Sequence, residues 1–311
     1  MSDEGPAKWE RALIEKMVYS AVDEQRKARR WGIFFKLFFV VYLLILLGVA
    51  VAPKLDVIST EAHTALVDLN GLISADSPAN ADDVVGALQK AFKADGVKGV
   101  ILRINSPGGS PVQSEYIYAE IKRLRKKYPD VPLYAVVSEL CASGGYYVAA
   151  AADKIYAQKA SMVGSIGVLM NGFGVTEIMK TVGVERRLYT AGKSKGFLDP
   201  FTPVKEDDVV HIKKMLEDIH QLFIDRVREG RGKRLKENDE LFTGLIWTGE
   251  QAKALGLIDE FASPGYVARE IIGEEDIINY TSKGTLIDQF ADKLGTHAGA
   301  SVLDFMSMKL Q

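Results

Sequence analysis

The sequence predicts an α/β fold of repeated strand–helix–strand units, preceded by one N-terminal transmembrane helix. From about residue 62, short apolar runs alternate with segments of helical spacing, which is typical of parallel βαβ crossovers. Residues 37–52 read "LFFVVYLLILLGVAVA" and contain no charged side chain. A helix of about 20 apolar residues spans the hydrocarbon core of a bilayer, so this run predicts a membrane span.

The elements expected in the α/β region follow one another closely. Asn80 is the expected N-cap of the first helix, and a glycine-rich turn, "NSPGGS", separates the second strand from its helix. A long charged helix is expected near the C-terminal third of the region. The expected ranges are strand 64–73, helix 81–94, strand 97–104, helix 114–128, strand 132–138, helix 206–229, and a helix, glycine stop and short strand over 249–261.

The apolar run reaches 20 residues when extended back to Ile33, and Lys36 near its end can snorkel. The basic stretch "RKARR" precedes it, whereas only Lys54 is basic among residues 53–70. The positive-inside rule therefore predicts a cytoplasmic N-terminus and an extracytoplasmic main domain. A cleaved signal peptide is the alternative, because "AVA" before Pro53 resembles a cleavage site. The long preceding segment and Pro53 itself favour an uncleaved anchor.

The segment before the span also has helical spacing. Trp9, Leu13, Met17 and Ala21 recur every four residues with charged residues between them, which predicts an amphipathic helix. The sequence leaves open whether this helix contacts the membrane surface, a partner or solvent. The expected organisation is a cytoplasmic segment 1–30, a signal-anchor 31–53, a main domain 54–275 and a C-terminal tail 276–311.

Composition narrows the function classes. The chain has 47% hydrophobic and 26% charged residues and a net charge of −2, which is ordinary for a globular protein. This charge does not favour nucleic acid as a partner. Cys141 is the single cysteine, so no intrachain disulfide forms. No residues have metal-ligand spacing, and we expect neither a metal nor a cofactor.

Ser143 lies in "CASGGYYVAAAADK", where a strand is expected to pass into a helix. A helix-capping hydroxyl is one interpretation of this serine. The other is a nucleophile, because the glycine turn at 105–109 also follows a strand and can point free N–H groups at a ligand. Together with the Gly144 N–H, that turn would supply the donor pair of an oxyanion hole.

A serine nucleophile needs a base. None of the four histidines lies in a motif-like setting, and the GxSxG elbow of many hydrolases is absent. Lysine is therefore the better candidate for the base. Cys141 is an alternative nucleophile, although a small buried residue behind the site is the simpler interpretation.

Four segments, "NSPGG", "ASGGYYVAAAADKI", "SMVGSIGV" and "TAGKSKGFLDPF", occur in the order and spacing of the signal peptide peptidase A family, including its SohB-like branch. The resemblance covers roughly residues 62–275 and implies a membrane-anchored serine protease with the ClpP/crotonase fold. It implies that Ser143 is the nucleophile, Lys195 the general base, Gly109 and Gly144 the oxyanion donors, and Ser165 the hydroxyl that orients the lysine. It also implies a homo-oligomeric ring.

The sequence departs from the family at one position. The family places an aromatic residue directly before the lysine, whereas Ser194 precedes Lys195, which leaves Lys193 as a rival. A free ammonium cannot accept a proton at neutral pH, so the base must be desolvated. The neighbouring apolar residues Phe197, Leu198 and Phe201 could supply this, and we expect Asp199 to point elsewhere.

The expected function is therefore a membrane-anchored serine endopeptidase that hydrolyses apolar peptides, such as remnant signal peptides and membrane-protein fragments. Its expected location is the cytoplasmic (inner) membrane of a bacterium, with the catalytic domain in the periplasm and the lipid bilayer as a partner. Two other function classes remain: a crotonase-like acyl-CoA enzyme, and a non-catalytic membrane scaffold.

Overall fold

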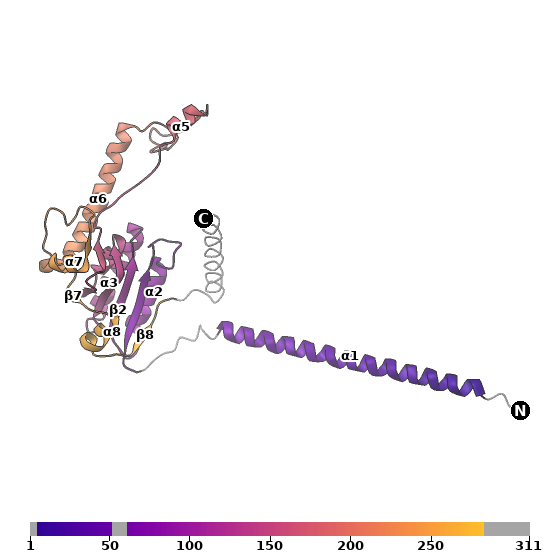
Figure 1. The fold of residues 1–311 in the computed structure, drawn as a ribbon. Coiled ribbons are helices and arrows are strands. Elements are labelled where there is room, and N and C mark those ends of the chain that lie inside the picture. The colour runs from indigo at the N-terminus through magenta and orange to yellow at the C-terminus, as the bar shows by residue number, and fades with distance from the viewer. Residues whose placement is uncertain (1–4, 52–60, 283–311) are drawn as a thin grey trace, which may run out of the picture. The chain divides into compact units, whose positions relative to one another are not determined.

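The computed structural model describes residues 5–51 and 61–282 (Figure 1). The chain divides into two compact units, Met1–Val57 and Ile58–Gln311. The described residues of the first unit form one long helix, and the second unit contains the sheet and all other described elements.

The N-terminal unit is a single continuous helix, α1 (Gly5–Val51), of 47 residues. Among the described residues, the stretch Trp9–Leu47 is the one long and apolar enough to cross a membrane. At about 1.5 Å per residue the helix is about 70 Å long, more than twice the thickness of a hydrocarbon core. The predicted amphipathic segment and the predicted anchor are thus parts of one helix.

The second unit is built on a sheet whose strand order is β6-β5-β3-β2-β1-β8, with β4 paired to β3 and β7 to β4. All of these pairs are parallel except β5–β6. Parallel neighbours joined through helices confirm the predicted α/β class. The strands are β1 (His63–Asn70), β2 (Val97–Ser106), β3 (Leu133–Ala142), β4 (Lys154–Ala157), β5 (Met162–Gly164), β6 (Ile246–Thr248), β7 (Glu260–Phe261) and β8 (Ile277–Asn279).

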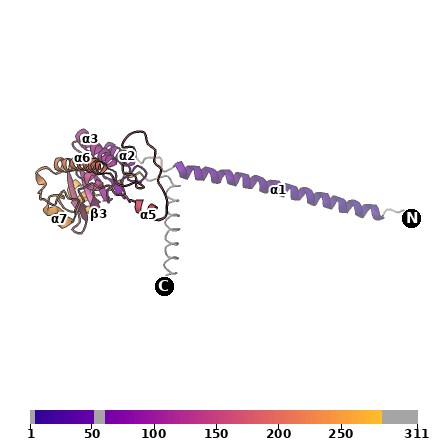
Figure 2. The same ribbon diagram turned by 90° about the horizontal axis from the view of Figure 1, so that it is seen from above.

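Helices α2 (Ala81–Lys93), α3 (Pro111–Lys127) and α4 (Gly144–Ala149) bury the larger apolar core with the sheet. Seen from above, α2, α3 and α6 lie on the same side of β3 (Figure 2). Asn80 caps α2 as predicted, since its side chain accepts a hydrogen bond from the Asp83 N–H at 2.9 Å. A smaller core includes residues of the π-helix η3 (Val267–Ile272), which follows α8 (Pro264–Tyr266), together with Leu66, Ile101 and Val136.

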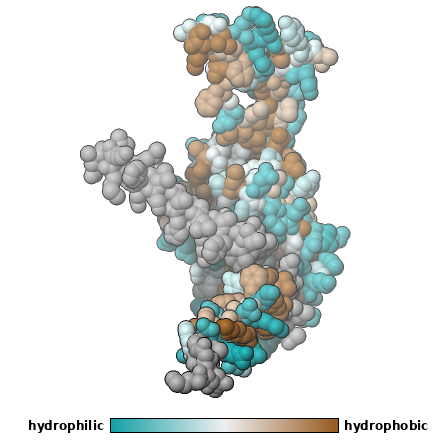
Figure 3. Space-filling model, turned by 90° about the vertical axis from the view of Figure 1, so that its right-hand side faces the viewer, coloured by the Kyte–Doolittle hydropathy of each residue, from teal (hydrophilic) through white to brown (hydrophobic). Residues whose placement is uncertain are grey.

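Residues 168–222 form an arm that runs away from the sheet (Figure 1). It contains α5 (Thr176–Thr181) and most of α6 (Glu206–Arg231), the long charged helix that the sequence predicts. Apolar patches gather over the upper part of the molecule in Figure 3. Phe173 and Tyr189 are 88% and 89% exposed, so the apolar side chains of the arm are not buried within the chain. Other exposed apolar residues of the arm are Leu169, Met170, Ile178, Val182, Val184, Leu188, Phe201, Val204, Val210, Met215 and Leu222.

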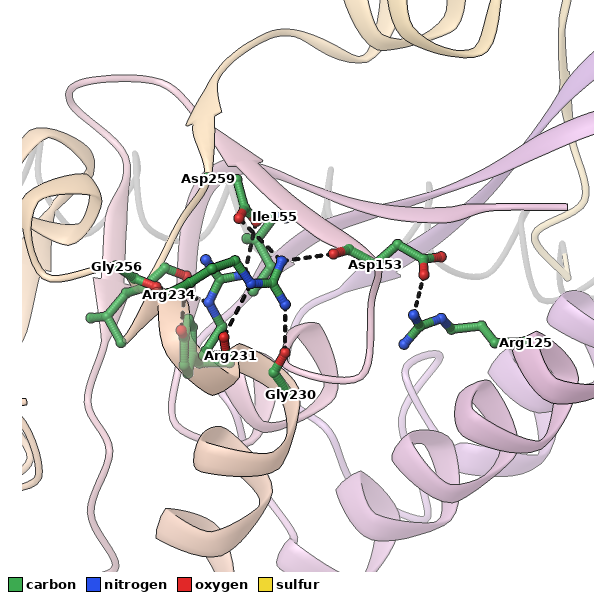
Figure 4. A network of polar contacts seen from close by, with 10 residues as sticks. Arg125, Asp153, Ile155, Gly230, Arg231, Arg234, Gly256 and Asp259 are labelled. Atoms are coloured by element: carbon green, nitrogen blue, oxygen red, sulfur yellow. Dashed lines mark hydrogen bonds and ion pairs between the residues drawn. The ribbon is translucent and has the colours of Figure 1, made fainter. Parts of the chain in front are cut away.

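The base of α6 is fixed to the sheet by a buried ion pair. Arg231, only 1% exposed, donates to Asp259 and to the Gly256 carbonyl, both at 2.8 Å (Figure 4). Asp259 also accepts from the Ile155 N–H at 2.7 Å and from Arg234 at 3.1 Å. Burial alone raises the pKa of Asp259, but these hydrogen bonds and charges outweigh it and hold the pKa below its usual value.

Two short helices follow α6 in the chain. They are the 3₁₀ helix η2 (Gly232–Arg234) and α7 (Gly249–Ala254). Thr248 and Gln251 form a capping box at the start of α7. This helix, followed by β7, matches the helix–stop–strand pattern expected over 249–261.

The sheet continues past the predicted domain boundary at residue 275. β8 pairs with β1 in register Thr64↔Ile277, and the Tyr280 hydroxyl lies 2.8 Å from His63 Nε2. The first and last described strands of the domain therefore lie side by side. The predicted C-terminal tail lies outside the described residues from 283 onward.

Candidate active site

Ser143 lies in a sharp turn between β3 and α4. Its φ is 50° and its ψ is −123°, a conformation that non-glycine residues rarely adopt. The turn is held by the Ser143 N–H, which donates to the Gly164 carbonyl at 2.9 Å, and by the Ser143 carbonyl, which accepts from the Tyr147 N–H. The side chain makes no capping hydrogen bond, so the capping interpretation is wrong. The half-buried hydroxyl occupies a strained strand–turn–helix site resembling a nucleophile elbow, without the GxSxG sequence.

The glycine turn after β2 lies directly against Ser143. Gly108 and Gly109 have φ values of 95° and 147°, in the region that favours glycine. A Cβ on Gly108 would lie 2.6 Å from the Gly144 nitrogen and 2.7 Å from the Ser143 Cβ. A Cβ on Gly109 would overlap the Ile73 carbonyl oxygen. The close approach of the two turns therefore requires glycine at both positions.

Two backbone N–H groups beside Ser143 are unused. A Cβ on Gly144 would lie 3.2 Å from the Gly109 nitrogen, so the two peptide groups are close neighbours. Within residues 61–282, neither the Gly109 N–H nor the Gly144 N–H donates a hydrogen bond. Free N–H donors next to a nucleophile are what a tetrahedral oxyanion requires.

Ser165 follows β5 as Ser143 follows β3. The register Ala142↔Gly164 places the two serines one residue beyond paired positions on neighbouring parallel strands. Ser165 also has a positive φ, 52°, and its N–H donates to the Leu245 carbonyl at 2.7 Å. The structure thus brings Ser143, Gly144, Gly109 and Ser165 to one end of the sheet.

Lys195 lies elsewhere, in the arm between α5 and α6. It is exposed, and its N–H closes a turn by donating to the Gly192 carbonyl at 3.1 Å. Among the described residues no hydrogen bond or ion pair joins Lys195 to Ser143 or Ser165. Asp199 accepts from the Phe201 N–H and pairs with Arg186 at 3.4 Å, and no ion pair joins it to Lys195 among the described residues. The rival Lys193 is exposed in the same turn.

Cys141 does not have the properties of a nucleophile. Its side chain is fully buried in β3, and burial raises the pKa of its thiol far above the usual value. The reactive thiolate is therefore disfavoured. Cys141 is the small buried residue that the simpler interpretation predicted.

Two buried serines that sequence reasoning missed support the glycine turns. The Ser114 Oγ would lie 2.5 Å from a Cβ on Gly144, and it donates to the Ser110 carbonyl at 2.9 Å. The Ser106 hydroxyl donates to the Gly71 carbonyl in the turn after β1 and accepts from the Gly108 N–H in the turn after β2. Ser106 lies inside the "NSPGG" motif, which was the available signal, whereas nothing in the sequence distinguishes Ser114 from other helical serines.

A polar cluster connects α4 with the base of the arm. The Tyr147 hydroxyl donates to Glu115 of α3, which also accepts from Arg226 of α6 at 2.6 Å. Burial, together with Glu115, raises the pKa of Tyr147, so the phenol stays a neutral donor. The helix that begins beside Ser143 is thereby linked to α6.

No group of three or more metal-ligating side chains occurs among the described residues.

Comparisons with known proteins identify a peptidase family. Residues 125–274 match the model of peptidase family S49. A putative protease of Methanocaldococcus jannaschii is 38% identical over 176 residues, which are 57% of this chain and 56% of that protein. The probable protease SohB of Haemophilus influenzae is 30% identical over 232 residues, 74% of this chain and 64% of that protein.

Part of a longer protein has a higher sequence identity to this chain than these two proteases have. The Na(+)/H(+) antiporter NhaA of Brucella abortus is 45% identical over 190 residues, 61% of this chain but only 26% of that protein. The chain thus spans between about a quarter and two thirds of the relatives described. A solved mutant of the 1510-N membrane-bound stomatin-specific protease aligns with a TM-score of 0.41 and 15% identity, over 72% of this chain and 96% of that one.

Proposed function

This chain belongs to the SppA/SohB-like peptidases of family S49, and we propose that it is a membrane-anchored serine endopeptidase with a Ser143–Lys195 dyad. The observation that carries the proposal is the geometry at Ser143. A strained, half-buried hydroxyl lies beside two unused N–H groups that come from separate turns. A structural serine would need neither the strain nor the unused donors.

The chemistry follows from these groups. The Ser143 Oγ attacks the carbonyl carbon of the scissile peptide bond while its proton passes to the uncharged amine of Lys195. The carbonyl oxygen becomes an oxyanion that accepts hydrogen bonds from the N–H groups of Gly109 and Gly144. The lysine then returns the proton to the leaving amine. Water hydrolyses the acyl-enzyme by the same steps, which restores the serine.

Assembly is part of the proposal, because the dyad is not formed within one copy. Lys195 is exposed on the arm, and the arm carries apolar side chains that the chain itself does not bury. Both features support a homo-oligomeric ring in which the arm of one copy brings Lys195 to Ser143 of its neighbour. Burial in that contact would desolvate the amine and favour the uncharged form that acts as a base.

The substrates that fit the proposal are extended apolar peptides, such as remnant signal peptides and fragments of membrane proteins. The basic residues before the span support a cytoplasmic N-terminus and a catalytic domain outside the inner membrane of a bacterium. Neither a crotonase-like acyl-CoA enzyme nor a scaffold accounts for the strained Ser143.

Labelling with a serine-reactive fluorophosphonate tests the proposal. The detergent-solubilised chain should be modified at Ser143, located by mass spectrometry of peptides, and lose peptide hydrolysis in parallel. Ser143→Ala is the control and should not be labelled. Labelling of another residue, or full turnover by Ser143→Ala, would contradict the proposed nucleophile.

A further inference from the structure

The buried side chain of Ser106 lies where three segments of the site meet. It is the last residue of β2 and is 0% exposed. Its hydroxyl donates to the Gly71 carbonyl at 2.6 Å and accepts from the Gly108 N–H at 3.1 Å. Its Cβ would be 3.3 Å from a Cβ on Gly145, in the first turn of α4. One side chain therefore contacts the turns after β1 and β2 and the helix after β3.

Gly108, the residue before the Gly109 N–H, is held on both sides, by Ser106 and by Ile73. The Gly108 N–H is directed inward to Ser106, and the Gly108 carbonyl accepts from the Ile73 N–H at 2.8 Å. The Gly108 carbonyl and the Gly109 N–H belong to the same planar trans peptide group and point in opposite directions. With the carbonyl fixed toward Ile73, the Gly109 N–H is fixed on the opposite side, where the structure leaves it free.

We propose that Ser106 is a positioning residue that sets the orientation of the Gly109 oxyanion donor. This inference rests on the proposed peptidase function and adds a residue that does not touch the substrate. Without the hydroxyl, the buried Gly108 N–H and Gly71 carbonyl lose a partner, and Gly108 is held on one side only, by the bond from the Ile73 N–H to its carbonyl. The resulting misplacement weakens the bond to the oxyanion more than it weakens peptide binding.

Ser161 is a matched control for the loss of a buried hydroxyl. It is 2% exposed, donates to the Ser138 carbonyl at 2.7 Å and accepts from the Gln158 N–H at 3.0 Å. Ser161→Ala therefore removes the same two kinds of hydrogen bond from a turn that contacts neither glycine donor. A general loss of packing would affect both variants alike.

The test compares Ser106→Ala and Ser161→Ala in the full chain, with activity expressed per folded molecule. We expect Ser106→Ala to lower kcat by about 10- to 100-fold with little change in KM. Its affinity for a peptide boronate should fall by a similar factor, because the tetrahedral adduct on Ser143 places an oxygen against the proposed oxyanion donors, the N–H groups of Gly109 and Gly144. Ser161→Ala should keep both kcat and boronate affinity near those of the wild type.

An equal loss of kcat in the two variants, or an unchanged kcat in Ser106→Ala, would contradict the positioning role of Ser106. If Ser106→Ala does not fold, Ser106→Cys fills the site with a slightly larger side chain and a weaker hydrogen-bonding group, and it should show the same selective fall in kcat. A wild-type chain that neither cleaves peptides nor reacts at Ser143 would overturn the proposed function itself, and this inference with it. Activity of the wild type thus separates the two failures.

Discussion

Ser143 and Ser165 occupy equivalent positions at the ends of two neighbouring parallel strands, and both have a φ near 50°. The Ser143 N–H donates to the Gly164 carbonyl, so the turn of one serine is tied to the residue before the other. Two strained serines held side by side by the sheet form a rigid end of the site. Lys195, the proposed base, belongs to a different and exposed part of the chain, so the two halves of the proposed dyad are positioned independently.

The strain at Ser143 predicts a trade between stability and activity. Ser143→Gly should raise the free energy of unfolding by about 1 kcal/mol, because glycine adopts positive φ values without steric cost. Ser143→Ala should leave it nearly unchanged, since the hydroxyl caps no helix. Both variants should lose all peptide hydrolysis. Chemical denaturation of the three proteins checks this, and a less stable Ser143→Gly would show that the turn is not strained.

The lysine assignment predicts different effects of two nearby substitutions. Lys195→Ala should abolish turnover, whereas Lys193→Ala should reduce it less than about tenfold, because only the first removes the proposed base. Rates of peptide hydrolysis measured on equal amounts of folded protein decide between them. An inactive Lys193→Ala beside an active Lys195→Ala would shift the base by two residues.

A shared site predicts recovery on mixing inactive variants. Ser143→Ala and Lys195→Ala copies that exchange subunits would form some sites with an intact serine and an intact lysine, and hydrolysis should return. Each variant alone is the control and should remain inactive. Continued inactivity despite demonstrated subunit exchange would mean that each copy forms its own dyad.

The contact between Ser114 and Gly144 predicts a coupled pair of substitutions. Gly144→Ala should destabilise the domain, because the new methyl would lie 2.5 Å from the Ser114 Oγ and 3.2 Å from the Gly109 nitrogen. Adding Ser114→Ala should restore about 1 kcal/mol, since it relieves the closer overlap. A double-mutant cycle from denaturation curves measures the coupling. Strictly additive effects would contradict the predicted overlap.

The buried ion pair at the base of α6 predicts a pH-dependent stability. Because the pKa of Asp259 is held below its usual value, its ionised form stabilises the fold at neutral pH. That contribution is lost as the pH falls below about 4 and through the pKa of the folded state. Asp259→Asn should cost about 3 kcal/mol at pH 7, because Arg231 stays buried without a charged partner.

The difference between wild type and Asp259→Asn should therefore shrink as the pH is lowered toward 3. Urea denaturation at several pH values measures it, with the exposed Asp130→Asn as the control that should not change. A difference that stays constant from pH 7 to pH 3 would contradict the role of the Asp259 charge.

The strands and helices were predictable because their periodicity is local. β1, α2, β2, α3, β3 and α6 lie within a few residues of the expected ranges, and Asn80 caps its helix. β8 was not predictable, since a three-residue strand carries too little alternation to be distinguished from a tail. The continuity of α1 through its basic stretch agrees with local propensity, because arginine, lysine and alanine all favour helix.

The site was partly predictable for a similar reason. Ser143 and the glycine turns are marked by residue type at strand ends, where parallel strands bring distant segments together. Ser106 was missed because its importance comes from bonds to Gly71 and Gly108 that only the folded turns create. The position of Lys195 depends on the path of the arm, which local patterns do not encode.

The parallel arrangement of β1, β2 and β3 places Ser143 far from the first described residues of the domain. The chain enters the domain at the start of β1, where His63 contacts Tyr280, while Ser143 follows the far end of β3. A ten-residue strand at about 3.3 Å per residue makes the separation about 30 Å. Ser143 therefore lies about a full strand length from the residue at which the described part of the domain begins, and the strands between them set that spacing.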